Sequence, residues 1–120
     1  LRAPPPRASL RLAAARRLAL ELDHGALPIQ GPPGTGKTYA AARMVMDLVA
    51  AGRTAAITAQ SHKTISNLLE ATMAAGASEH VPIRAIQKAG EDDAHVGHLD
   101  GVTRIGDNPA VRGVLAAIFK

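Results

Sequence analysis

Eight consecutive residues constrain this chain more than any other segment does. Positions 31–38 read Gly-Pro-Pro-Gly-Thr-Gly-Lys-Thr and satisfy the pattern G-x-x-x-x-G-K-[ST] at every fixed position. The glycines allow backbone angles that other residues avoid, so successive N–H groups can turn toward an anion. The segment therefore predicts a loop that holds a phosphate chain, followed directly by the N-terminus of a helix.

The other positions of this loop have expected roles on a nucleoside triphosphate. Lys37 would place its charge beside the β- and γ-phosphates, and the Thr38 hydroxyl would ligate Mg²⁺. These two are the predicted catalytic residues, and Thr38 is the predicted metal contact. Tyr39 could stack on a base or simply lie on the helix surface. The predicted contacts to ATP and Mg²⁺ are Gly31, Pro32, Pro33, Gly34, Thr35, Gly36, Lys37, Thr38 and Tyr39.

The flanks of the loop read as a strand and a helix, which is the context a phosphate-binding loop needs. Residues 26–30 are a short, mostly apolar run, although Pro28 cannot donate a ladder hydrogen bond. Residues 37–51 contain no helix breaker and stop at Gly52, and residues 54–59 read as the next strand. Together they predict a βαβ unit whose helix packs on a parallel sheet.

The remaining elements follow from periodicity and from breakers. A first helix has its apolar stripe at Leu10, Ala14, Leu18 and Leu22. All elements together predict an α/β fold with a parallel sheet flanked by helices, and an incomplete one. The further expected elements are a helix over 9–23 closed by a turn at 24–25, a helix over 61–75 closed by Gly76, a weaker strand over 81–86, a loop over 88–107 and a helix from Asn108.

Charge and composition restrict the classes of function. Five arginines and no acid fall within the first twenty residues, which accounts for the net charge of +4 and favours a polyanionic partner. The simpler explanation of these arginines is that they form a solvent-exposed face of a helix. The absence of cysteine excludes disulfides and thiolate metal sites. No apolar run approaches the roughly 20 residues that span a bilayer, so we expect a cytoplasmic protein without membrane contact.

Two further observations concern metal binding and completeness. His95 and His98 lie among acidic residues, but their spacing matches no established zinc pattern. We therefore expect no metal site other than that for the Mg²⁺ of the nucleotide. The chain begins at Leu1 rather than at Met, and we expect it to be a piece of a larger protein.

A second polar segment follows the second predicted strand. Its residues Ser61, His62, Lys63 and Thr64 end a strand and open a helix, the edge at which open α/β sheets bind ligands. Two hydroxyls, exposed N–H groups and one cation suit phosphodiester contacts that read no base sequence. The alternative is an ordinary helix start with Ser61 as its N-cap.

These two motifs resemble motifs I and Ia of superfamily 1 helicases. Residues 29–38 resemble motif I of the Upf-like and Dna-like branch, and residues 58–69 resemble motif Ia, with Gln60 and His62 in place of its usual proline and asparagine. The chain also looks like bacterial proteins in which a RecB-like nuclease domain precedes such a helicase. The resemblance implies a basic leading helix over 1–25 and the N-terminal part of a RecA-like ATPase domain over 26–120.

The resemblance also implies an activity and its partners. ATP hydrolysis would be coupled to movement along single-stranded DNA or RNA, or to unwinding, and a second RecA-like domain would lie in the rest of the chain. No Walker B strand ending in Asp-Glu and no arginine finger is found, so we expect the chain alone to turn over little. The alternatives are an AAA+ ATPase that remodels protein or nucleic-acid complexes, and a non-motor nucleotide-binding protein.

Overall fold

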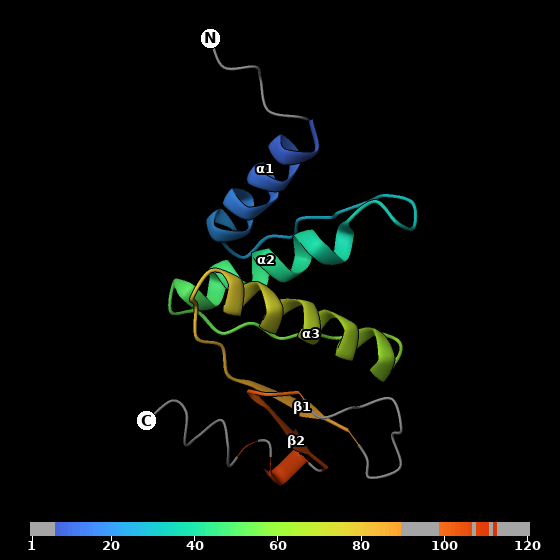
Figure 1. Ribbon diagram of the computed structural model, residues 1–120, viewed down its shortest axis with the longest axis vertical. Helices are drawn as coiled ribbons and strands as arrows, with labels where there is room; N and C mark the ends of the chain where they lie inside the picture. Colours follow the sequence, from blue (N-terminus) through green and yellow to red (C-terminus); the bar gives the residue numbers. More distant parts are fainter. Residues whose placement is uncertain (1–6, 90–98, 107, 111, 113–120) are drawn as a thin grey trace.

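The computed structural model describes residues 7–89, 99–106, 108–110 and 112. Figure 1 shows the helices stacked in chain order, with a pair of strands beyond the third helix. α1 packs on α2 and α2 packs on α3. This arrangement confirms an α/β architecture with parallel strands. The elements are α1 (Arg7–Glu21), α2 (Lys37–Ala50), α3 (His62–Ser78), β1 (Ala85–Lys88) and β2 (Val102–Ile105).

α2 begins and ends as its sequence predicts. Gly52 has φ 79° and follows the C-cap residue Ala51. The Gly52 N–H donates to the carbonyl of Val49, and the Arg53 N–H donates to that of Leu48, each at 2.9 Å. These two bonds are those of a Schellman motif, which satisfies carbonyls that the end of the helix leaves without partners.

α3 does not end where the sequence predicts. The prediction that Gly76 closes this helix is wrong, because the helix continues to Ser78. A Cβ added at Gly76 would lie 2.7 Å from Ile83 Cδ1 and 2.8 Å from the Val81 carbonyl oxygen. Glycine is therefore required by the close passage of the next segment over the helix, and His80, with φ 57°, makes the turn.

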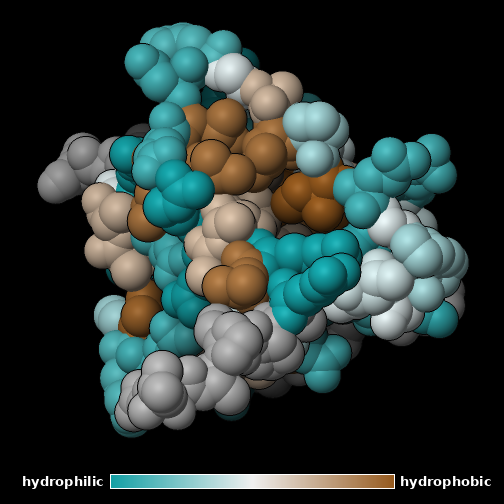
Figure 2. Space-filling model, turned by 90° about the horizontal axis from the view of Figure 1, so that it is seen from above, coloured by the Kyte–Doolittle hydropathy of each residue, from teal (hydrophilic) through white to brown (hydrophobic). Residues whose placement is uncertain are grey.

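α1 presents its leucine stripe to the outside. Leu10 is 53 % exposed and Leu22 is 42 % exposed, whereas Ala19, which is not part of the stripe, is buried. Figure 2, seen from the α1 end, shows this side of the molecule with apolar surface bordered by hydrophilic residues. The stripe is thus not the face that packs on α2. Ala19 is the buried residue among those described in α1, and its small side chain permits a close approach at that point.

One arginine of α1 fastens it to the rest of the molecule. Arg16 donates from Nε and Nη2 to the two carboxylate oxygens of Asp47, both at 2.7 Å, and from Nη2 to Glu79 at 3.2 Å. These carboxylates raise the pKa of Arg16 above its ordinary value. Arg53 adds a bond of 2.9 Å to the Leu20 carbonyl. Arg16 therefore serves the fold and is not a spare cation for a polyanion.

The sheet differs from the prediction. Neither 26–30 nor 54–59 forms a strand, and α2 packs between α1 and α3 instead of on a sheet. A strand exists only through ladder hydrogen bonds, and the described residues supply neither segment with such a neighbour. The predicted strand over 81–86 begins only at β1, beyond Pro82.

The described sheet consists of β1 and β2. They pair in parallel, with a register from Ala85 opposite Val102 to Lys88 opposite Ile105. β2 lies inside the predicted 88–107 loop, so that part of the prediction is wrong. Buried Gln87 donates from Nε2 to Ser66 Oγ at 3.0 Å and thereby ties β1 to α3.

Three sequence predictions concern features beyond these elements. Residues 108–110 are helical, as predicted from Asn108, whereas the part of that prediction over 113–120 lies outside the described residues. His95 and His98 also lie outside the described residues. Among the residues described, no group of three or more potential metal ligands occurs. None of the described helices has the length and apolar character needed to cross a membrane.

Candidate functional site

The phosphate-binding loop projects from the N-terminal end of α2 (Figure 1). Gly34 has φ 80°, and Gly36 has φ 85° and ψ 20°, both in the left-handed region. A left-handed Gly36 followed by right-handed Lys37 is an arrangement that turns successive N–H groups toward one point. No side chain caps α2. The first turn of this helix therefore keeps backbone donors available for an anion.

Two residues of the loop stabilise its shape. Thr35 donates from Oγ1 to the Pro32 carbonyl at 2.7 Å. A Cβ added at Gly31 would lie 2.8 Å from that same hydroxyl oxygen, so any larger residue would disturb the turn. Gly31 and Thr35 were both predicted from the sequence as nucleotide contacts. In the structure, the Thr35 side chain lies within the loop, and Gly31 provides the space for it.

Lys37 and Thr38 lie in the first turn of α2, where both are exposed. The Lys37 ammonium donates to the carbonyl oxygens of Gly31 and Pro32. Those carbonyls are neutral acceptors, and a phosphate oxygen would be a stronger one. The donor set of this loop, namely one ammonium, one hydroxyl and uncapped N–H groups, fits a triphosphate with its Mg²⁺.

A ring–cation pair follows on the same helix. The Arg43 guanidinium carbon lies 3.4 Å from the centroid of the Tyr39 ring, and Arg43 Nη1 is 3.5 Å from the Tyr39 carbonyl oxygen. The Tyr39 residue is 54 % exposed. The sequence reasoning singled out Tyr39 but missed Arg43. Their spacing of i and i+4 on one helix was a signal that could have identified the pair.

The second polar segment forms the beginning of α3. Ser61 is its N-cap and accepts from the Thr64 N–H at 3.2 Å, and the two hydroxyl oxygens are 2.9 Å apart. Lys63 is exposed, and His62 is partly buried. Both hydroxyls thus take part in the cap, while the Lys63 side chain projects from the first turn.

α2 and α3 point in the same direction in the structure. Their N-terminal ends face the same side of the molecule, as Figure 1 shows. The phosphate-binding loop and the segment 61–64 therefore open toward one side, and their helix N-termini present donors there. The predicted nucleotide contacts 31–39 are brought together at the first of these ends, and the predicted nucleic-acid contacts at the second.

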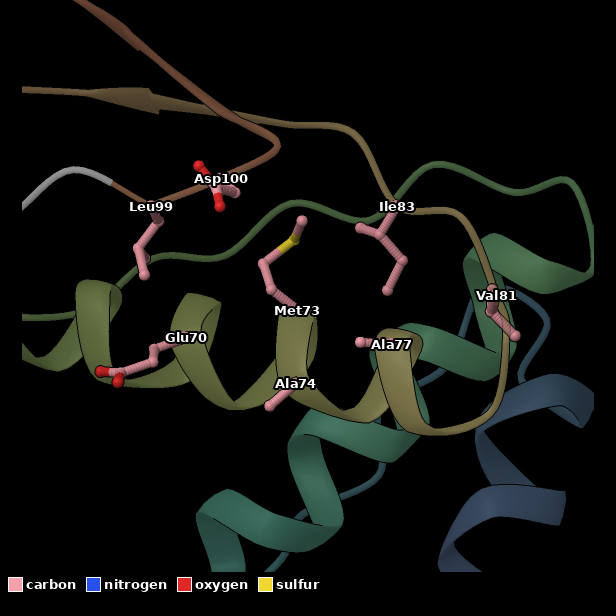
Figure 3. Close-up of a pocket in the computed structure, with 8 residues that line it drawn as sticks. All are labelled: Glu70, Met73, Ala74, Ala77, Val81, Ile83, Leu99 and Asp100. Carbon is pink, nitrogen blue, oxygen red and sulfur yellow. The ribbon is translucent and has the colours of Figure 1, made fainter.

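A separate hollow lies between α3 and the segments that lead into β1 and β2 (Figure 3). Its volume is about 450 Å³. Neither 31–39 nor 61–64 contributes to it, and its lining contains carboxylates but no cation, so it is unsuited to a polyphosphate. The residues that line it are Glu70, Met73, Ala74, Ala77, Val81, Ile83, Leu99 and Asp100.

The chain matches a known protein-family model. A family model described as AAA domain matches residues 9–110, which is most of the chain. The match supports a P-loop domain of helicase-like type, with nucleotide binding as its general property. No curated protein and no solved structure matches the chain.

Proposed function

The chain belongs to the AAA domain family, and on that premise we propose that it is the ATP-binding part of an ATP-dependent DNA or RNA helicase. One observation carries this proposal. The loop 31–38 and the segment 61–64 stand at the N-terminal ends of two helices that face the same side of the molecule. A phosphate chain and a nucleic-acid backbone are both polyanions, and each suits such an end.

In this proposal the loop residues bind ATP and Mg²⁺. Bound ATP supplies the phosphoryl group that is transferred to water. Gly34 and Gly36 turn the backbone N–H groups toward the phosphates, and Lys37 exchanges the loop carbonyls for phosphate oxygens and balances charge that develops there. Thr38 would hold Mg²⁺ through its hydroxyl. The acid that activates water and an arginine finger would come from other parts of the complete protein.

The start of α3 would contact the sugar–phosphate backbone of a single strand. Lys63 supplies a charge, and the N-terminal turn of the helix supplies backbone N–H groups. Such contacts are independent of base sequence, which is what a protein that moves along a strand requires. Hydrolysis by the second RecA-like domain and the first together would then drive the movement.

The test is the ATPase activity of the complete protein, measured with and without a single-stranded oligonucleotide. We expect stimulation by the oligonucleotide in the wild-type protein and loss of activity in Lys37→Ala. Lys88→Ala is a matched control, because Lys88 is exposed on β1, outside both motifs. Activity that survives Lys37→Ala would refute the nucleotide site. ATPase activity that is unchanged by both DNA and RNA would refute the proposed helicase function.

One observation favours a second candidate function. The hydroxyls of Ser61 and Thr64 bond to each other and to the backbone, which is the arrangement of an ordinary capped helix. The chain would then belong to an AAA+ ATPase that remodels complexes, or to a nucleotide-binding protein without motor activity. Hydrolysis stimulated by a protein partner, and unchanged by any strand, would identify the remodelling ATPase.

A further inference from the structure

Tyr39 combines exposure with a fixed position next to the phosphate-binding loop. It is the third residue of α2, and the first bond of that helix is the one from the Ala40 N–H to the Gly36 carbonyl at 3.0 Å. The Tyr39 N–H therefore belongs to the N-terminal donors that the helix itself leaves open. A phosphate chain bound at those donors lies within reach of this residue.

The direction of the side chain follows from helix geometry. Side chains on a helix tilt toward its N-terminus, so the Tyr39 ring leans toward the loop and away from the body of α2. Arg43 lies one turn further along and stacks at 3.4 Å from the ring centroid. Because Arg43 comes from the following turn, its guanidinium lies over the ring from the C-terminal side, and the 54 % exposure of Tyr39 leaves room for a ligand on the other face.

From this geometry we infer that the open face of Tyr39 is the surface on which the base of the nucleotide stacks, with Arg43 as the residue that positions the ring. The inference rests on the nucleotide site of the proposed function. Arg43 acts through Tyr39: the guanidinium stacked on one face restricts the rotation of the ring and presents the other face to the ligand.

The chemistry of a stacking face determines which ligands it accepts. Every base has a π-face, so stacking on an aromatic ring gives affinity without selecting one base. Larger rings stack over a larger area. The site therefore accepts Mg²⁺ complexes of ATP and GTP about equally and binds UTP more weakly, which makes it a site for purine nucleoside triphosphates and not for ATP alone.

The first test compares nucleotides with a ligand that has no base. We would measure the binding of Mg²⁺ complexes of ATP, GTP, UTP and inorganic tripolyphosphate to the wild-type protein and to Tyr39→Leu. Leucine keeps an apolar side chain but lacks the aromatic face. Because a stacked base contributes roughly 1–3 kcal/mol, Tyr39→Leu is expected to weaken ATP and GTP by about tenfold or more. Tripolyphosphate binding should stay the same.

Matched variants separate stacking from damage to the fold. Tyr39→Phe retains the ring and should recover most of the affinity that Tyr39→Leu loses. Arg43→Ala should lower nucleotide affinity to an intermediate extent, again without affecting tripolyphosphate, whereas Arg84→Ala, which removes an exposed arginine ahead of β1, should change neither. Equal losses for ATP and tripolyphosphate in Tyr39→Leu, or no loss for either, would overturn the inference.

The same measurements distinguish this inference from the proposed function. Lys37→Ala should weaken ATP and tripolyphosphate together. If Lys37→Ala binds both as tightly as the wild type does, the nucleotide site itself is wrong. A normal Lys37 effect combined with no Tyr39 effect would reject only the stacking face.

A spectroscopic readout tests the contact directly. Isotope-labelled tyrosine gives NMR signals of the tyrosine rings, and those that disappear in Tyr39→Phe belong to Tyr39, which is the single tyrosine among residues 1–120. Stacking of a base should shift these ring signals when ATP is added, and tripolyphosphate should leave them in place. Identical shifts with both ligands, or no shift with either, would contradict the inference.

Discussion

The beginnings of α2 and α3 solve the same problem in opposite ways. Every helix starts with N–H groups that have no partner within the helix. At α3, the Ser61 side chain accepts from the Thr64 N–H, so the cap is internal. At α2, left-handed Gly36 precedes the helix and no side chain caps it. At α3 one of the open donors is satisfied within the chain, whereas the start of α2 has no side-chain cap and leaves its donors to an anion from outside.

The difference between the two helix starts indicates which of them can bind an anion more strongly. A ligand at the start of α3 must compete with a bond that already exists, and it gains little from the hydroxyls. A phosphate at the start of α2 meets uncapped donors and the Lys37 ammonium, whose acceptors are neutral carbonyls. The comparison ranks the start of α2 above the start of α3 as an anion site, and four substitutions can break or sharpen that ranking.

The largest effect is expected at Lys37. Lys37→Ala removes the only full charge of the loop, and ATP hydrolysis by the complete protein should fall by roughly a hundredfold or more, as for the loss of one preorganised electrostatic group. Lys63→Ala at the other helix should mainly change the dependence on a single strand. Steady-state ATPase assays at several strand concentrations separate the two. Equal losses of basal activity in both variants would contradict the ranking.

The next effect concerns the left-handed glycine before α2. Gly36→Ala places a Cβ at φ 85°, which costs on the order of 1–2 kcal/mol. We expect a lower free energy of unfolding by denaturant and weaker ATP binding in the fraction that remains folded. Gly106→Ala is the matched control, because the glycine lies in open space and has no positive φ. Equal stability of the two variants would show that the loop adopts another conformation.

A comparable loss of stability without loss of binding is expected at the far end of α2. Arg16→Met keeps most of the aliphatic stem but leaves the part-buried Asp47 without its guanidinium. We expect a loss of about 1–2 kcal/mol, because a half-buried carboxylate loses its partner. Arg17→Met breaks only an exposed pair and should cost a few tenths. Isothermal titration with ATP should give wild-type affinity for both variants.

The smallest effect is expected at the cap of α3. Ser61→Ala should lower stability by about 1 kcal/mol, and Ser61→Gly by only a few tenths. ATP affinity should stay unchanged in both, as measured by thermal unfolding with and without nucleotide. A loss of ATP affinity in Ser61→Ala would show that the two helix beginnings are coupled, and would overturn the comparison between them.

The predictable parts of this molecule are those with local causes. The loop 31–38, the start of α2 and its end at Gly52 depend on neighbouring residues only, and the sequence identifies each. The positions of the strands depend on partners distant in sequence, and here the prediction failed. The 26–30 and 54–59 runs have apolar character but no ladder partner among the described residues.

Two other features could not be predicted because helix packing decides them. The leucines of the apolar stripe on α1 remain largely exposed, and Ala19, which lies outside that stripe, is buried instead. A glycine at position 76 suggests the end of a helix. Its actual role is to leave room for Val81 and Ile83, which pass close over the helix, and this appears only in the structure. For the candidate site, the sequence found Tyr39 but not the arginine stacked on it.

The Arg16 bridge also bears on the order in which the molecule assembles. It joins residues 31 positions apart at Asp47 and 63 positions apart at Glu79. Closing such long loops costs chain entropy before any contact can compensate for it, so we expect the helices to form first and this bridge to form after they have docked. Its removal should therefore speed unfolding much more than it slows folding, and Arg16 would act mainly on the lifetime of the folded chain.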